Sequence, residues 1–240
     1  MSEWALKRFW TAVSVAREDD GYAVLLDGRG VKTPAKKPLH VPSHAAASLI
    51  AAEWEAQVGQ VDPTTMPHTR MANAAIDKVA VQFDEVANLL SDFGETDLLC
   101  YRAEGPEGLR ARQAEAWDPL LAWANEQYGA KLTPVTGVMF APQAPKALEA
   151  LRAALQEQSN FELAALHDLI SLTGSLVMGL AASQAAFDSE QLWAWSRIDD
   201  SWQIEQWGED EEAMQVAEIK HRAFQDAYNF YHAVRVLPAK

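Results

Sequence analysis

The chain has 240 residues, of which 49% are hydrophobic and 22% charged, a composition typical of a folded globular protein with one sizeable core. The formal net charge of −14 argues against nucleic acid and anionic membrane surfaces as partners, because no basic stripe is present to neutralise phosphates. Cys100 is the single cysteine, which excludes an intrachain disulfide and fits a reducing compartment.

The N-terminal sequence MSEWALKRFW lacks the apolar core of a secretory signal and carries Glu3, which is atypical of a transit peptide. Short apolar runs broken by glycine and proline follow, and they predict a small antiparallel β domain over residues 1–42. Gly28 is given a structural role there, because the DGRG segment (27–30) reads as a hairpin turn. The segment lacks the Lys-Ser/Thr pair of a phosphate-binding loop.

After residue 42 the apolar spacing becomes helical and predicts a larger, mostly helical domain over residues 43–240, hence the class α+β. Ser43 is a predicted N-cap, and Trp54 belongs to the apolar face of the helix that follows. Residues 70–93 predict one long amphipathic helix. Residues 108–129 predict a helix that is bent or restarted at Pro119.

The segment TDLLCYR (96–102) predicts a helical turn or a buried loop, and Pro145 opens a further helix. Asn160 is the predicted cap of the most buried helix, over 161–182. Its apolar run contains glycines and polar residues, so a membrane span is only a remote alternative. Ser189 is the predicted cap of a helix over 190–207, and a last helix follows over 209–234.

No residue pattern indicates an enzyme, a cofactor site or a metal site. The six histidines form no H-x-x-x-H pair with an adjacent glutamate, which is the spacing that places zinc ligands on one helical face. His167 and Asp168 read as a core or helix-surface pair rather than a catalytic one. Ser175 does not match a nucleophile elbow, and Cys100 reads as a small buried hydrophobe.

The segment QIEQWGEDEEAM (203–214) joins a Trp-Gly corner to four consecutive acids. A purely structural interpretation ends one helix at Gly208, packs Trp207 beneath the corner and places Glu209 to Glu212 in the first turn of the next helix. However, four adjacent acids exceed what a helix dipole uses, and Asp200 and Glu205 add charge upstream. A binding surface for a basic or amide-rich partner is therefore an equally weighted interpretation.

Five segments, in this order along nearly the whole chain, carry a family resemblance. They are LDGRGVKTPAKKPLHVP (26–42), EWEAQVGQVDPTTMPHTRMANAAID (53–77), TDLLCYRA (96–103), WDPLLAWA (117–124) and WQIEQWGEDEEA (202–213). The chain thereby resembles the assembly chaperone for the alpha subunit of the ATP synthase catalytic sector. The resemblance implies a non-enzymatic protein that binds the free alpha subunit, masks an aggregation-prone surface and leaves when alpha joins the beta subunit. It also implies a small N-terminal β domain and a larger helical domain.

The resemblance further implies which residues contact the partner. The family's Gln-x-x-x-Trp-Gly segment falls on Gln203, Trp207 and Gly208, and the acids near it are Asp200, Glu205, Asp210 and Glu211. Trp54, in EWEAQ, matches another characteristic position, with a packing role. The chain starts close to the first of these segments, so it resembles a bacterial, cytoplasmic member rather than a mitochondrial one.

Two alternatives remain open at this stage. One is a small-molecule-binding or hydrolytic domain that uses His167, Asp168 or the DGRG turn, and the other is a general scaffold with an acidic surface. A pocket lined by converging titratable groups would favour the enzyme, whereas an extended apolar groove without such groups would favour the chaperone.

Overall fold

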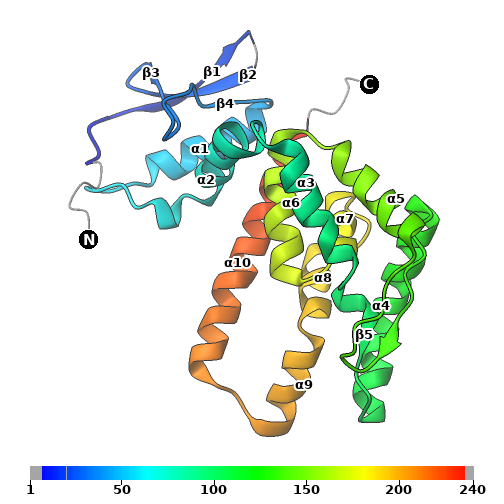
Figure 1. The fold of residues 1–240 in the computed structure, drawn as a ribbon. Helices are drawn as coiled ribbons and strands as arrows, with labels where there is room; N and C mark the ends of the chain where they lie inside the picture. Colours follow the sequence, from blue (N-terminus) through cyan, green and yellow to red (C-terminus); the bar gives the residue numbers. More distant parts are fainter. Residues whose placement is uncertain (1–6, 20, 236–240) are drawn as a thin grey trace. The chain divides into compact units, whose positions relative to one another are not determined.

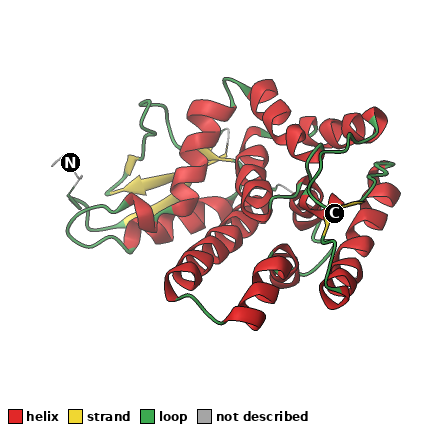
Figure 2. Cartoon of the chain, turned by 60° about the horizontal axis from the view of Figure 1, so that its bottom comes forward, coloured by secondary structure: helices red, strands yellow, loops and turns green. Residues whose placement is uncertain are grey.

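The computed structural model describes residues 7–19 and 21–235, which divide into two compact units (Figure 1). The sheet unit consists of the described residues up to 83 together with 159–165 and those from 229 onward. The helical unit consists of residues 84–158 and 166–228. Antiparallel strands at the N-terminus and a mostly helical remainder confirm the predicted α+β class. Figure 2 shows helix as the predominant structure outside the N-terminal sheet.

The sheet of the sheet unit is built around β2 (Gly21–Leu26), whose apolar residues form its buried face. β1 (Val13–Glu18) pairs with one edge of β2 in antiparallel register, while β3 (Arg29–Gly30) and β4 (His40–Val41) pair with the other. The β2–β3 turn has positive φ at both Asp27 (48°) and Gly28 (79°), as a two-residue hairpin requires. The predicted hairpin at DGRG is confirmed.

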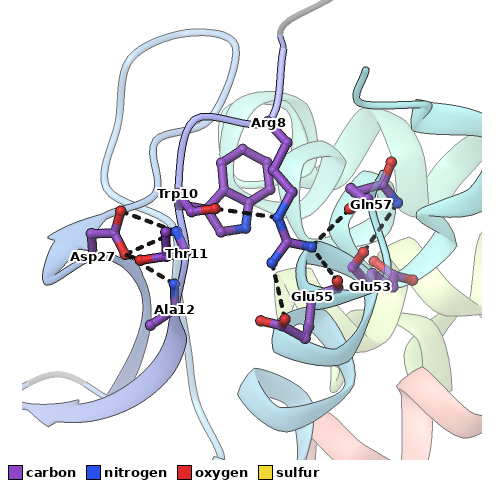
Figure 3. Close-up of polar contacts among 8 residues, drawn as sticks. All are labelled: Arg8, Trp10, Thr11, Ala12, Asp27, Glu53, Glu55 and Gln57. Atoms are coloured by element: carbon purple, nitrogen blue, oxygen red, sulfur yellow. Dashed lines mark hydrogen bonds and ion pairs between the residues drawn. The ribbon is translucent and has the colours of Figure 1, made fainter. Parts of the chain in front are cut away.

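Two polar networks hold residues 8–12, one to the β2–β3 turn and the other to the end of α1 (Figure 3). The Asp27 carboxylate accepts hydrogen bonds from the backbone N–H groups of Ala12 and Thr11, which hold the pKa of Asp27 below its usual value. The Arg8 guanidinium donates to the backbone carbonyls of Glu55 (2.5 Å) and Gln57 (2.8 Å), at the end of α1 (His44–Glu55). These carbonyls lack intrahelical partners, so Arg8 satisfies groups that the helix end leaves open.

Helix α1 packs on β1 and β2 and carries two predicted residues. The Ser43 side chain accepts from the N–H of Ala46, which confirms it as the N-cap. Trp54 is buried, with its ring centroid 5.2 Å from that of Trp10. The neighbouring Glu53 is also buried and accepts from the backbone N–H groups of His68 and Thr69, at the start of α2 (Pro67–Ala74). A buried carboxylate thus caps α2 in place of a local side chain.

Outside the sheet, several predicted helices are divided. The predicted helix over 70–93 consists of α2, a π-helical turn (Ala75–Val79) and α3 (Phe83–Ser91), so its continuity was wrong. The Ala75 carbonyl accepts from the N–H of Ala80 and from the Asn160 amide, which replaces the normal α-helical bond. Asn160 therefore lies inside α6 (Asn160–Thr173) and is not its cap. Ser159 caps α6, through reciprocal hydrogen bonds with Glu162.

The helical unit continues with α4 (Glu107–Tyr128), α5 (Pro145–Gln156), α7 (Leu176–Ser183), α8 (Ser189–Ser196), α9 (Ile198–Trp207) and α10 (Glu211–Val234). Two short strands, β5 (Tyr101–Arg102) and β6 (Val135–Thr136), pair in parallel. The predicted opening of α5 by Pro145 is confirmed. The predicted restart at Pro119 is wrong, because α4 continues through it. Pro119 and Glu115 are exposed, so water can bond the carbonyl that the proline leaves free.

The predicted helix over 161–182 breaks at Gly174 (φ 69°), between α6 and α7. Ser175 caps α7, and the fully buried Asp97 accepts from the N–H groups of Leu99 and Val177, so it bridges the TDLLC turn to α7. Burial raises the pKa of Asp97 to about 6. Cys100 is buried too, and burial raises its pKa to about 12, as for an unreactive thiol.

The predicted helix over 190–207 is divided at Arg197 into α8 and α9, and its cap is Asp188 rather than Ser189. The Trp117 indole N–H donates to the carbonyl of Trp195 (2.9 Å). Near the end of α8, this carbonyl therefore bonds to a side chain of α4. The predicted boundary after residue 42 coincides with the end of the strands, whereas the compact sheet unit also includes α1 and α2. As a boundary between folding domains, residue 42 stays a prediction. No helix in the described part of the chain is long and apolar enough to cross a membrane.

Candidate functional site

The end of α9 has almost no packing partner. Every residue from Gln203 to Trp207 is exposed, and 80% of the surface of Trp207 is accessible. The prediction that Trp207 packs beneath the corner is therefore wrong. Gly208 ends α9 with φ 92°, a conformation that residues with a side chain rarely adopt, which confirms its predicted place at the helix end.

The acids after Gly208 have different local roles. Asp210 caps α10, because its carboxylate accepts from the backbone N–H groups of Glu212 (2.9 Å) and Ala213 (3.2 Å). Glu211 and Glu212 lie in the first turn, where the helix dipole favours negative charge. Glu209 precedes the helix, so its predicted place in the first turn is wrong.

Glu205 is tied to α4 by a bidentate ion pair with Arg112, with nitrogen–oxygen distances of 2.6 and 3.0 Å. These hydrogen bonds hold the pKa of the Glu205 carboxyl below its usual value. The Arg112 guanidinium also lies 4.9 Å from the centroid of the Trp202 ring. The same indole covers Gly108, where an added Cβ would lie 2.9 Å from it. Together these contacts anchor α9 on α4.

Two further acids of α9 are compensated within the chain. Asp200 forms an ion pair with Arg197, and Asp199 accepts a hydrogen bond from the buried Gln113 side chain at 2.6 Å. Neither Arg112 nor Gln113 is among the predicted site residues. Their partners lie about ninety positions away in sequence, and periodicity gives no signal at that distance. Glu205 therefore holds α9 on α4 as well as presenting charge to solvent, whereas the ion pair of Asp200 is local to the start of α9.

The remaining acids form an uncompensated acidic corner, defined as Glu209, Asp210, Glu211 and Glu212. In the part of the chain that the structure describes, no lysine, arginine or histidine lies within ion-pair distance of Glu209, Glu211 or Glu212. All four acids are exposed. The corner can therefore attract a cationic partner without first breaking an internal ion pair.

Apolar side chains lie next to this corner, on what we call the α9–α10 hairpin (residues 203–220). From Glu211 to Lys220 every residue of α10 is exposed except the half-buried Ala217. The large apolar side chains exposed on the hairpin are Ile204, Trp207, Met214, Val216 and Ile219. Such side chains are normally buried, and a cluster of them on a surface marks an interaction site. Figure 1 shows the hairpin as α9 and the first part of α10, joined at the bottom of the view.

Among the described residues, two cavities lie beside the exposed end of α9 (residues 203–207). One, of about 440 Å³, lies between α9 and α10, and its lining includes Trp193, Ile204 and Met214. The other, of about 870 Å³, lies between α9 and segment 101–106, and its lining includes Leu109 and Val138. Gln203 and Trp207 line both cavities, so the Gln-x-x-x-Trp pair forms the ridge between them.

The alternative, enzymatic prediction rests on two separate features of the chain, the His167–Asp168 pair and the DGRG turn. The exposed His167 and the half-buried Asp168 form a pair on α6 (2.9 Å), and the hydrogen bond that the Asp168 carboxylate accepts from the ring raises the pKa of His167. The DGRG turn belongs to the sheet unit, whereas this pair belongs to the helical unit. Among the described residues, no group of three or more histidine, cysteine or acidic side chains is placed to hold a metal ion.

Comparisons with known proteins agree on one family. The model of the ATP12 chaperone protein family matches residues 7–125. The crystal structure of Atp12 from Paracoccus denitrificans, and that of a mutant of the same protein, are each 48% identical to this chain. Each match covers 95% of this chain and 98% of the other, with a TM-score of 0.91. The mitochondrial protein atp12 of Schizosaccharomyces pombe is 27% identical over 224 residues, which span 88% of this chain and 77% of the relative.

Proposed function

The chain belongs to the ATP12 chaperone family, and from that premise we propose that it binds the free alpha subunit of the ATP synthase catalytic sector. On this proposal it prevents alpha from aggregating until alpha joins the beta subunit, it acts in the bacterial cytoplasm, and it is not an enzyme. It needs no cofactor, because the work is done by an interaction surface.

The observation that carries this proposal is the α9–α10 hairpin. An unassembled subunit exposes apolar surface meant for a neighbour, and such surface aggregates unless it is covered. The hairpin offers exposed apolar side chains for that purpose, with Trp207 the largest of them. Large aromatic side chains are the residues that most often dominate binding energy at interfaces.

The client contact is proposed to include Gln203, Trp207, Asp210 and Glu211 directly. Asp200 and Glu205 contribute charge at the edge of the surface, and the ion pair of Glu205 with Arg112 also fixes α9 on α4. Gly208 contributes the corner itself. Charged residues at the rim of an interface mainly set the association rate and the choice of partner, which suits a chaperone that has to release its client.

The test is a pull-down of the purified chain against separately expressed alpha and beta subunits of the same ATP synthase. Suppression of alpha aggregation is followed in parallel by light scattering. Selective capture of alpha, together with suppressed aggregation, is the expected result. If alpha aggregates as usual and is not captured, the proposed function is wrong, and ligand screening around His167 becomes the next experiment.

The contribution of the acidic corner is tested by charge reversal. The double variant Glu209→Lys/Glu211→Lys avoids the capping residue Asp210, so the helix start is retained. We expect the association rate with alpha to fall about tenfold at low salt, because like charges then meet. The matched control is Glu149→Lys/Glu157→Lys, which makes the same change in net charge at exposed positions on α5 and just after it. An equal fall in both variants would remove the corner from the interface.

A further inference from the structure

The groove between α9 and α10 has the features of a site for one additional helix. Both walls are helices, so their backbone groups are already hydrogen-bonded and a client strand could not pair with them. Apart from Gly208 at the corner, the residues that line the groove carry side chains, and the apolar ones include Ile204 and Trp207 on one wall and Met214 and Ala217 on the other. Residues three apart lie on one helical face, so Ile204 and Trp207 share one face of α9, and Met214 and Ala217 share one face of α10.

The facing stretch of α10 depends on such a partner more than an ordinary surface helix does. Helices in proteins are stabilised mainly by packing of one apolar face, yet Glu211–Lys220 packs almost no side chain against the described residues. Ile219 keeps 64% of its surface accessible and Met214 43%. The apolar side chains in this part of α10 therefore lack the packing partner that a helix of a bundle normally has.

Charge indicates what the missing helix carries. The acidic corner lies at the closed end of the groove, where Asp210 is itself part of the lining. Arg197 is the cationic side chain in that lining, and its charge is taken up by Asp200. A segment with basic residues beside its apolar stripe would therefore be attracted, whereas an acidic segment would be repelled.

From these observations we infer that the α9–α10 groove binds an amphipathic helix of the client whose apolar stripe is flanked by lysine or arginine. The inference rests on the proposed function, since it takes the alpha subunit as the source of that helix. It goes beyond that function because it specifies the form of the bound segment and names Ile204 and Met214 as the contacts that recognise it.

The experiment measures binding of the purified alpha subunit to the wild-type chain and to the variants Ile204→Asp and Met214→Asp. The control is Leu89→Asp, an exposed leucine on α3. Circular dichroism and thermal melting establish that each variant is folded, as the partial exposure of the three side chains leads us to expect. We expect each groove variant to weaken alpha binding at least tenfold and the control variant to change it less than twofold.

A second arm uses a designed probe, a peptide of about five helical turns with leucines on one face and lysines beside them. The peptide should bind the wild-type chain and displace alpha. A version with the same composition but leucines spread around the helix should not, and neither should a version with glutamates in place of lysines.

The outcomes separate the two proposals. If both groove variants capture alpha as strongly as the wild-type chain does, and the peptide does not displace alpha, the groove inference is overturned and the proposed function still stands. No capture of alpha by the wild-type chain would overturn the proposed function. A concentration-dependent dimer that Ile204→Asp dissociates would show that a second copy covers the groove, and it would also overturn the inference.

Discussion

Helix α7 and the first part of α10 are both helical segments rich in apolar side chains, but they differ completely in burial. All eight residues of α7 are buried, and Gly179 is so close to Ile170 that an added Cβ would lie 2.4 Å from its side chain. Met214, Val216 and Ile219 of α10 are exposed instead. The same residue types therefore form the core in one segment and, in the other, stay exposed on the surface that we propose binds the client.

The largest expected effect on the free energy of unfolding comes from a matched pair of truncations, one in α7 and one in α10. Leu180→Ala in α7 should lower the free energy of unfolding by about 2–5 kcal/mol, because it removes a fully buried side chain and leaves a cavity. Ile219→Ala in α10 should change it by less than about 0.5 kcal/mol. Denaturant unfolding measures both. If Ile219→Ala costs as much as Leu180→Ala, the hairpin belongs to the core and the comparison fails.

Asp97, which bonds to the start of α7, predicts that the stability of the chain depends on pH. The pKa of Asp97 is raised to about 6 in the folded chain, so the folded state holds its proton more tightly than the unfolded state does. Stability from this group is therefore present below about pH 4 and is lost as the pH rises through about 6. The size of the loss is on the order of 2–3 kcal/mol.

Asp97→Asn isolates this effect, because asparagine does not titrate. The difference in unfolding free energy between wild type and variant should shift by that amount between pH 4 and pH 7, in favour of the variant at the higher pH. A difference that stays constant across this range would contradict the assignment to Asp97.

The corner of the hairpin should show a smaller effect. Gly208→Ala places a side chain at φ 92° and should cost about 1–2 kcal/mol through backbone strain, since no atom lies near enough to clash with the new Cβ. Gly30→Ala is the control, because Gly30 has an ordinary φ and a similarly open position. Thermal melting of the two variants compares them, and equal melting temperatures would mean that α9 and α10 adjust freely around the corner.

The smallest expected effect on stability comes from Asp210, where two substitutions separate its role as a helix cap from its charge. Asp210→Ala removes the cap of α10 and should cost about 1 kcal/mol, whereas Asp210→Asn keeps a capping oxygen and should cost only a few tenths. Both variants remove the charge, so both should slow association with alpha at low salt by a similar factor. Normal association of Asp210→Asn would show that the cap, rather than the charge, is what the hairpin needs.

Local signals predicted much of this fold correctly. The hairpin at Gly28, the cap at Ser43 and the helix start at Pro145 all depend on residues adjacent in sequence. Errors arose where a distant group decided the outcome. Asp97 bridges to the start of α7, and the Trp117 indole takes the carbonyl of Trp195 at the end of α8, so two predicted helices are divided.

The candidate site shows the same limit. The sequence identified the Trp-Gly corner and its acids, but its structural interpretation packed Trp207 beneath the corner, whereas the indole is exposed. The residues near Glu205 in sequence give no indication that it forms an ion pair with Arg112. Exposure of the hairpin depends on the packing of the whole helical unit, and periodicity alone cannot separate an apolar face that is covered from one that is not.

The exposure of Glu211–Lys220 also has a consequence for motion. Backbone amides in a segment with few buried contacts exchange with solvent through local opening, whereas those of α7 require the global unfolding reaction. Deuterium uptake should therefore be fast along the first part of α10 and slow along α7. A client bound to the hairpin would slow uptake there while leaving α7 unchanged, so the occupied state can be followed amide by amide in the intact chain.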